Sequence, residues 1–138
     1  MFKSLKANND LNGKISLDEA KKILPPSFRL PKEFSGYKIN DIKILNRATN
    51  YFEVSLTYKN GSKEIIIREL NITGNAALSD NYNIGENIQI VDINGYKGIV
   101  GTIGNSTSII KYTDSNIVYV FRSQVRSDEL VNIAKSFK

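Results

Sequence analysis

Residues 36–70, GYKINDIKILNRATNYFEVSLTYKNGSKEIIIREL, contain the clearest alternation of apolar and polar side chains in the chain. In the middle of this stretch one face is apolar, as in a half-buried β-strand. The residues on that face are Phe52, Val54, Leu56 and Tyr58. Asn60-Gly61 follows at once and is typical of a type I′ turn, so residues 62–70 are expected to complete a β-hairpin.

In the strand before this hairpin, the apolar side chains switch from one face to the other. Tyr37 and Ile39 lie on one side of the alternation, whereas Ile42 lies on the other. This shift predicts a β-bulge near Asn40 and Asp41, and bulges bend sheets.

Residues 88–121 predict two more hairpins, one about Asn94-Gly95 and one about Asp114-Ser115. The last strand, residues 116–121, is apolar on both faces. A strand of this kind is buried on both sides, so we expect it at the centre of the sheet with a helix on one face.

Two helices are expected to flank the strands. Ser16 and Glu19 form a capping-box pattern at the start of a short helix that Pro25-Pro26 ends, and Ser127 is the expected N-cap of a helix over residues 127–137. Residues 27–35 are expected to run extended over the sheet edge. The pattern predicts an α+β fold: a curved antiparallel sheet of about seven strands, a half-barrel, in one domain over residues 15–138 after a flexible segment, residues 1–14.

Composition restricts the classes of function. The chain has 138 residues, 41% of them hydrophobic, a formal charge of +5, and neither cysteine nor histidine. Without histidine it lacks the commonest general base near neutral pH, so we expect no enzyme and no cofactor. Its lysines alternate with acidic residues and form no long basic run, so nucleic acid is not an expected partner. No run reaches the roughly 18 apolar residues of a membrane span, and residues 1–7 lack the apolar core of a signal peptide.

Aromatic side chains on the predicted strands are candidates for one wall of an apolar groove, although such rings also commonly fill a core. The polar segment 71–87 is long for a connection in a compact domain, and it could form a binding lip. The candidate ligand-binding residues are Tyr51, Tyr58, Asp80, Tyr82, Tyr96, Tyr112 and Tyr119.

An alternative site is a calcium loop, because residues 8–19 match the spacing of such loops. The oxygen ligands would come from Asn8, Asp10, Asn12, the Lys14 carbonyl, Ser16 and Glu19. Only two of these positions carry a carboxylate, and the first is Asn rather than Asp. Helix capping already explains Ser16 and Glu19. The alternative function is therefore a calcium-stabilised structural module.

Four stretches carry a resemblance to a known family: ISLDEAKKILPPSFRLPKEFSGYKI (15–39), VSLTYKNGSKEIIIRE (54–69), VDINGYKGIV (91–100), and IVYVFRS followed by SDELVNIAKSFK (117–138). Their order and spacing resemble the Gram-positive domain-of-unknown-function family 4367, which occurs outside the membrane on lipoproteins and anti-sigma factors and is related to LolA/RseB-like half-barrels. Ser35 departs from the usual proline, and the membrane anchor is missing from this chain.

The resemblance implies an extracytoplasmic, cell-surface domain that senses or binds without catalysis, and it supplies no catalytic residues. By analogy with LolA-like folds, the concave face of the sheet would hold a lipid or a peptide. Contact with a membrane would come only through an anchor outside this chain.

Overall fold

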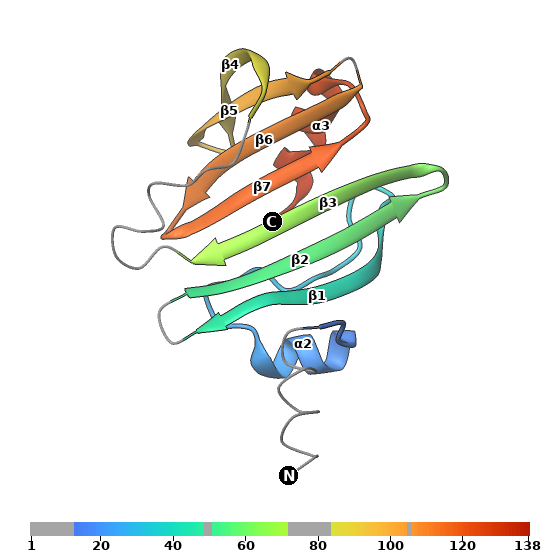
Figure 1. Ribbon diagram of the computed structural model, residues 1–138, viewed down its shortest axis with the longest axis vertical. Helices are drawn as coiled ribbons and strands as arrows, with labels where there is room; N and C mark the ends of the chain where they lie inside the picture. The colour runs from blue at the N-terminus through green and yellow to red at the C-terminus, as the bar shows by residue number, and fades with distance from the viewer. Residues whose placement is uncertain (1–12, 49–50, 72–83, 105) are drawn as a thin grey trace.

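The computed structural model describes residues 13–48, 51–71, 84–104 and 106–138 (Figure 1). Two helices and seven strands follow one another in the order α2 (Leu17–Ile23), β1 (Lys38–Ala48), β2 (Tyr51–Asn60), β3 (Lys63–Asn71), β4 (Glu86–Ile93), β5 (Tyr96–Ile103), β6 (Thr107–Asp114), β7 (Ile117–Ser123) and α3 (Ser127–Ser136). All seven strands form one antiparallel sheet with the order β1-β2-β3-β7-β6-β5-β4. The sheet does not close into a barrel. Because one antiparallel sheet is combined with helices before and after it in the chain, the predicted α+β fold is confirmed.

Two meanders build the sheet: β1-β2-β3 and β4-β5-β6-β7. They join where β3 pairs with β7, with Ile67 opposite Phe121. The last strand of the chain therefore lies at the centre of the sheet, as its two apolar faces predicted.

The predicted hairpins are present, with two corrections to their turns. Asn94-Gly95 is confirmed as the turn between β4 and β5, because both residues have positive φ angles, 55° and 95°. The first turn is centred one residue later than predicted: Asn60 pairs with Lys63, and of the residues between them only Gly61 has a positive φ. This arrangement fits a type II′ turn rather than type I′.

The last hairpin is also displaced by one residue. Asp114 pairs with Ile117, so the turn residues are Ser115 and Asn116, with φ angles of 51° and 72°. The predicted bulge in β1 is confirmed by a shift of register between Ile39 and Asp41.

Both predicted helices form. Ser16 caps α2 with the full capping box: its hydroxyl accepts from the Glu19 N–H at 3.1 Å, and the Glu19 carboxylate accepts from the Ser16 N–H at 2.9 Å. The predicted N-cap of α3 is wrong by one residue, because Ser127 is the first helical residue and Arg126 precedes it without a side-chain cap. Within the described ranges, no helix is long and apolar enough to span a membrane.

Residues 24–37 cross a face of the sheet and not its edge, which corrects the prediction for this segment. We call residues 24–37 the connector. Its side chains Phe28, Phe34 and Tyr37 are buried in the main hydrophobic core. Figure 1 views the sheet with the connector and α3 behind the strands. At the outer edge of β1, Gly13 and Ile15 hydrogen bond to the backbone of Ile44 and Ile42.

Candidate functional site

The two faces of the sheet have different surroundings. We call the face under the connector and α3 the covered face, and the opposite one the open face. Residues that pair across neighbouring strands share a face. Arg68 of β3 pairs with Ser55 and with Val120, and these three side chains lie on the open face. Among the described residues, neither α2 nor α3 lies on this face.

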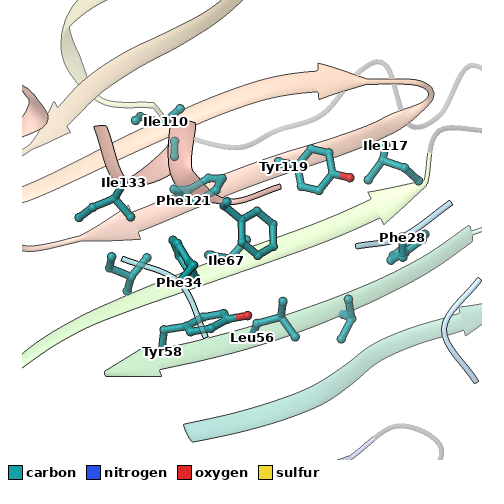
Figure 2. Close-up of a cluster of buried hydrophobic side chains, with 14 of the residues drawn as sticks. Phe28, Phe34, Leu56, Tyr58, Ile67, Ile110, Ile117, Tyr119, Phe121 and Ile133 are labelled. Carbon is teal, nitrogen blue, oxygen red and sulfur yellow. The ribbon is translucent and has the colours of Figure 1, made fainter. Parts of the chain in front are cut away.

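Three of the predicted ligand-binding tyrosines lie in the core of the covered face. Tyr58, Tyr112 and Tyr119 have exposed fractions of 0%, 2% and 1%. Figure 2 shows Tyr58 and Tyr119 in the buried cluster, together with Phe34 from the connector. The Phe34 ring meets the Tyr58 ring edge-on at 4.9 Å between centroids. A ligand would reach these rings only after the covering side chains had moved.

The other predicted residues are dispersed. Tyr96 is exposed at the rim of the covered face, where its ring stacks on Tyr112 with centroids 6.4 Å apart and a hydrogen bond to Asp114 raises its pKa. Tyr51 is on the open face. Asp80 and Tyr82 lie outside the described residues. The predicted residues that the structure describes therefore do not share one groove.

Arg29 of the connector joins distant parts of the covered face, and the sequence interpretation missed it. Its guanidinium donates to the Tyr112 hydroxyl at 2.8 Å, to the Phe137 carbonyl at 2.6 Å and to the Asp114 carboxylate at 2.9 Å. The same group lies 4.3 Å from the centre of the Tyr119 ring, in cation–π geometry. All these partners belong to the protein itself, so the arrangement is structural.

Glu69 of β3 is a buried carboxylate near Arg29. The Arg29 backbone N–H donates to its Oε1 at 3.0 Å, whereas its Oε2 is buried without a hydrogen-bond partner. Burial raises the pKa of Glu69 to about 8, although the bond from Arg29 opposes this shift. A raised carboxyl pKa is typical of general acids, but Glu69 is fully buried and cannot meet a substrate in this state.

The open face contains a groove that reaches from β1 to β5, which we call the sheet groove. It has a volume of about 490 Å³, within the range of small-molecule sites. Five of its lining residues are apolar: Leu45, Ile66, Ile103, Ile109 and Val120. Three are polar or charged: Ser55, Arg68 and Arg122. The sheet groove thus combines an apolar floor with two guanidinium groups.

The two arginines of the sheet groove differ in their pairing. Arg68 forms an ion pair with Glu53, and the Tyr51 hydroxyl donates to the same carboxylate at 2.6 Å. Burial and this hydrogen bond raise the pKa of Tyr51 to about 12. Arg122 is exposed, and in the described part of the chain no carboxylate pairs with it. Its positive charge is therefore available to an anion.

A second cavity adjoins the sheet groove at the end of the sheet. We call it the end cavity; it has a volume of about 810 Å³ and lies between the β2–β3 turn and the segment that leads into α3. Ile66 and Arg122 line both the end cavity and the sheet groove. The end cavity also has polar and charged walls, including Lys63, Gln124 and Arg126.

Only residues 13–19 of the predicted calcium loop lie within the described part of the chain. Ser16 and Glu19 are engaged with each other in the capping box, and this bonding lowers the pKa of Glu19. Lys14 pairs with Asp41 through its side chain at 3.3 Å. Residues 8–12, which include Asn8, Asp10 and Asn12, lie outside the described residues. Elsewhere, the described ranges contain no group of three acidic residues that could hold a metal ion.

Sequence reasoning missed the residues of the sheet groove because its basic residues alternate with apolar ones on β3 and β7. Such a pattern is typical of a solvated strand face. A usable signal was present: Arg68 and Arg122 follow runs of apolar residues whose other face is also apolar. Each of these arginines lies beside the apolar residues that line the groove.

Comparisons with known proteins add a family and a distant structural likeness. The family model described as "Domain of unknown function (DUF4367)" matches residues 28–137. No curated protein matches the chain. A solved structure described as a GTP binding regulator from Thermotoga maritima is similar, with 13% identity, coverage of 89% of this chain and 91% of that chain, and a TM-score of 0.49.

Proposed function

We propose that this chain, which belongs to the DUF4367 family, is a non-catalytic binding domain that holds an anionic amphiphile in its sheet groove. The ligand would be an acyl chain with an anionic end. The observation that carries the proposal is the lining of the groove: five aliphatic side chains and two arginines, with no carboxylate among the lining residues. The apolar floor of the groove would contact the acyl chain, and Arg122 would pair with the anionic end.

An acyl chain fits the sheet groove better than a peptide does. Peptides that bind to sheets commonly pair with an edge strand through backbone hydrogen bonds. Apart from Leu45 on the edge strand β1, the groove is lined by residues of β2, β3, β7, β6 and β5, and each of these strands is paired on both sides. The outer edge of β1 is itself hydrogen bonded to Gly13 and Ile15. Their backbone groups are therefore already bonded. An acyl chain needs only apolar contact, which is what Ile66, Ile109 and Val120 supply.

We also propose an extracytoplasmic location, with the domain carried by a membrane-anchored protein or lipoprotein. The support is the resemblance of residues 15–138 to domains on lipoproteins and anti-sigma factors. A domain that binds single amphiphiles at that place would report on, or retain, lipid-derived molecules at the cell surface. The apolar lining of the sheet groove is what such a role would require.

Calorimetric titration with dodecanoate, below its micelle concentration, tests the binding proposal. We expect the wild-type protein to bind dodecanoate and to bind dodecyl maltoside, a neutral amphiphile with the same chain, more weakly. Arg122→Gln should weaken dodecanoate binding about tenfold, because a charge-assisted hydrogen bond is lost. Leu45→Gln should weaken it about threefold through lost apolar contact.

Matched variants separate the groove from general surface effects. Arg47→Gln removes the same charge from an exposed position on β1 that does not line the groove. Leu30→Gln changes a leucine that is 47% exposed, close to the 42% of Leu45, on the connector. Both controls should bind dodecanoate like the wild type. Absence of dodecanoate binding, or equal losses in Arg122→Gln and Arg47→Gln, would refute the proposal.

A further inference from the structure

We infer that the end cavity holds the polar head group of the ligand, which makes the ligand a single-chain phospholipid and not a free fatty acid. This inference rests on the proposed function of the sheet groove. It is carried by the continuity of the two cavities, which share Ile66 and Arg122. An acyl chain over Ile66 would present its anionic end at Arg122, at the mouth of the larger cavity.

The shape of the end cavity favours a bulky head group. Its volume of about 810 Å³ exceeds the 490 Å³ of the sheet groove, whereas a carboxylate alone would occupy only the boundary at Arg122. The end cavity would then remain filled with water. A glycerophosphate group would extend from Arg122 into this space and exchange that water for contacts with the protein.

The chemistry of the walls favours a phosphate ester. Lys59, Lys63, Arg122 and Arg126 line the end cavity with two carboxylates, from Glu64 and Glu129, so the walls carry a net positive charge. The Lys63–Glu129 pair, at 3.0 Å, joins the β2–β3 turn to α3 across the cavity. Exposed pairs of this kind contribute little stability, so Lys63 can turn to a phosphate at low cost. Gln124 and Ser62 supply further hydrogen-bonding groups for a glycerol.

Both cavities include residues of β3 and β7, and this fixes the direction of the ligand. Ile66 and Arg122 pair across β3 and β7. From this pair, Leu45 and Ile109 line the sheet groove, whereas Lys63 and Arg126 line the end cavity. The acyl chain therefore points over the middle of the sheet, and the head group points to the β2–β3 turn.

Comparison of lysophosphatidylglycerol that carries a twelve-carbon chain with dodecanoate tests the inference by calorimetry. The phospholipid should bind the wild-type protein about tenfold more tightly, because the phosphate gains charge-assisted hydrogen bonds. The double variant Lys63→Gln/Arg126→Gln should lose this advantage while binding dodecanoate as the wild type does. The matched double variant Lys21→Gln/Arg47→Gln removes the same charges from exposed residues outside both cavities and should keep the advantage.

The outcomes separate this inference from the proposed function. Equal affinity for the phospholipid and for dodecanoate would overturn the head-group inference and leave the sheet groove as the binding site. Failure of both to bind would overturn the proposed function. A third probe, glycerol 1-phosphate without a chain, should bind far more weakly than the phospholipid. If it bound as tightly, the end cavity would be an independent anion site and the inference would be wrong.

Discussion

At the scale of single residues, Glu69 is the least expected feature of the fold. A carboxylate is rarely fully buried unless it is paired, and here one oxygen accepts the Arg29 N–H while the other has no partner. The rings of Tyr58, Tyr112 and Tyr119 lie in the same core. The raised pKa follows from this environment, because burial penalises the charged form.

Glu69 should make the stability of the protein depend on pH. Its pKa is raised to about 8 in the folded state and lies near 4.5 when the chain is unfolded. Between these values the folded protein holds a proton that the unfolded chain has released. The free energy of unfolding should therefore fall as pH rises from about 4.5 to about 8. Denaturant titrations across this range measure the effect.

The matched variant is Glu69→Gln, which keeps an oxygen acceptor for the Arg29 N–H and does not titrate. Its free energy of unfolding should decline less than that of the wild type over the same pH range. Parallel declines in the two proteins would show that Glu69 is not the titrating group.

At the scale of elements, the two helices begin differently. Ser16 precedes α2 and completes a capping box with Glu19, whereas α3 begins after Arg126 without a side-chain cap. Ser127 is inside α3, and its hydroxyl lies 3.3 Å from that of Ser108 on β6. The spacing of the glutamates differs in the sequence: Glu19 lies three residues after Ser16, as a capping box requires, whereas Glu129 lies two residues after Ser127.

The two serines should therefore respond differently to alanine. Ser16→Ala should lower the free energy of unfolding by about 1 kcal/mol, because a satisfied N-cap is lost. Ser127→Ala should cost clearly less, since its hydroxyl caps no helix N–H. Denaturant unfolding of both variants under identical conditions gives the comparison. A larger loss for Ser127→Ala would contradict the assigned caps.

The sequence predicted the elements well and their arrangement in part. Period-two alternation found the strands, positive-φ dipeptides found the turns within one residue, and the two apolar faces of residues 116–121 placed β7 at the centre. The path of the connector was missed because Pro25, Pro26 and Pro31 interrupt any periodicity. The hydrogen-bond partners of the Arg29 guanidinium were missed for a related reason: they lie 83 to 108 residues away in the chain.

The candidate site was harder to predict than the fold. The sequence predicts several tyrosines as ligand contacts, yet Tyr58, Tyr112 and Tyr119 lie beneath the connector. Which face of a sheet is covered depends on the path of the connecting segments, and periodicity describes only the alternation along each strand. The groove at Arg122 depends on the pairing of β3 with β7, which no local pattern specifies.

At the scale of the whole molecule, Arg29 links the connector to both halves of the covered face. Its guanidinium contacts Tyr112 and Asp114 of β6 and the backbone of Phe137 after α3, and its backbone contacts Glu69 of β3. The connector contributes apolar side chains to the core as well. One side chain therefore helps to hold the segment before β1 against the second meander.

Arg29→Met should lower the free energy of unfolding by about 2–3 kcal/mol, because several hydrogen bonds are lost and Asp114 keeps a partly buried charge. Arg29→Lys should lower the free energy of unfolding by less than Arg29→Met does, since lysine keeps the positive charge but not the forked geometry of the guanidinium. Arg126→Met is a suitable control. Both side chains of the Arg126–Asp128 ion pair are exposed, so removing the pair should not measurably change the free energy of unfolding. Equal stability of Arg29→Met and the wild type would refute the role of Arg29.

The pairing of β3 with β7 has a consequence for folding during biosynthesis. Leu45, Ile66 and Arg68 come from the first meander, whereas Ile109 and Arg122 come from the second. During translation the first three strands leave the ribosome long before β7 is synthesised. The edge of β3 that pairs with β7 therefore stays unpaired until the end of the chain has been made. The proposed ligand binding would thus be limited to fully synthesised, fully folded molecules, because nascent or truncated chains would contain only half of the sheet groove.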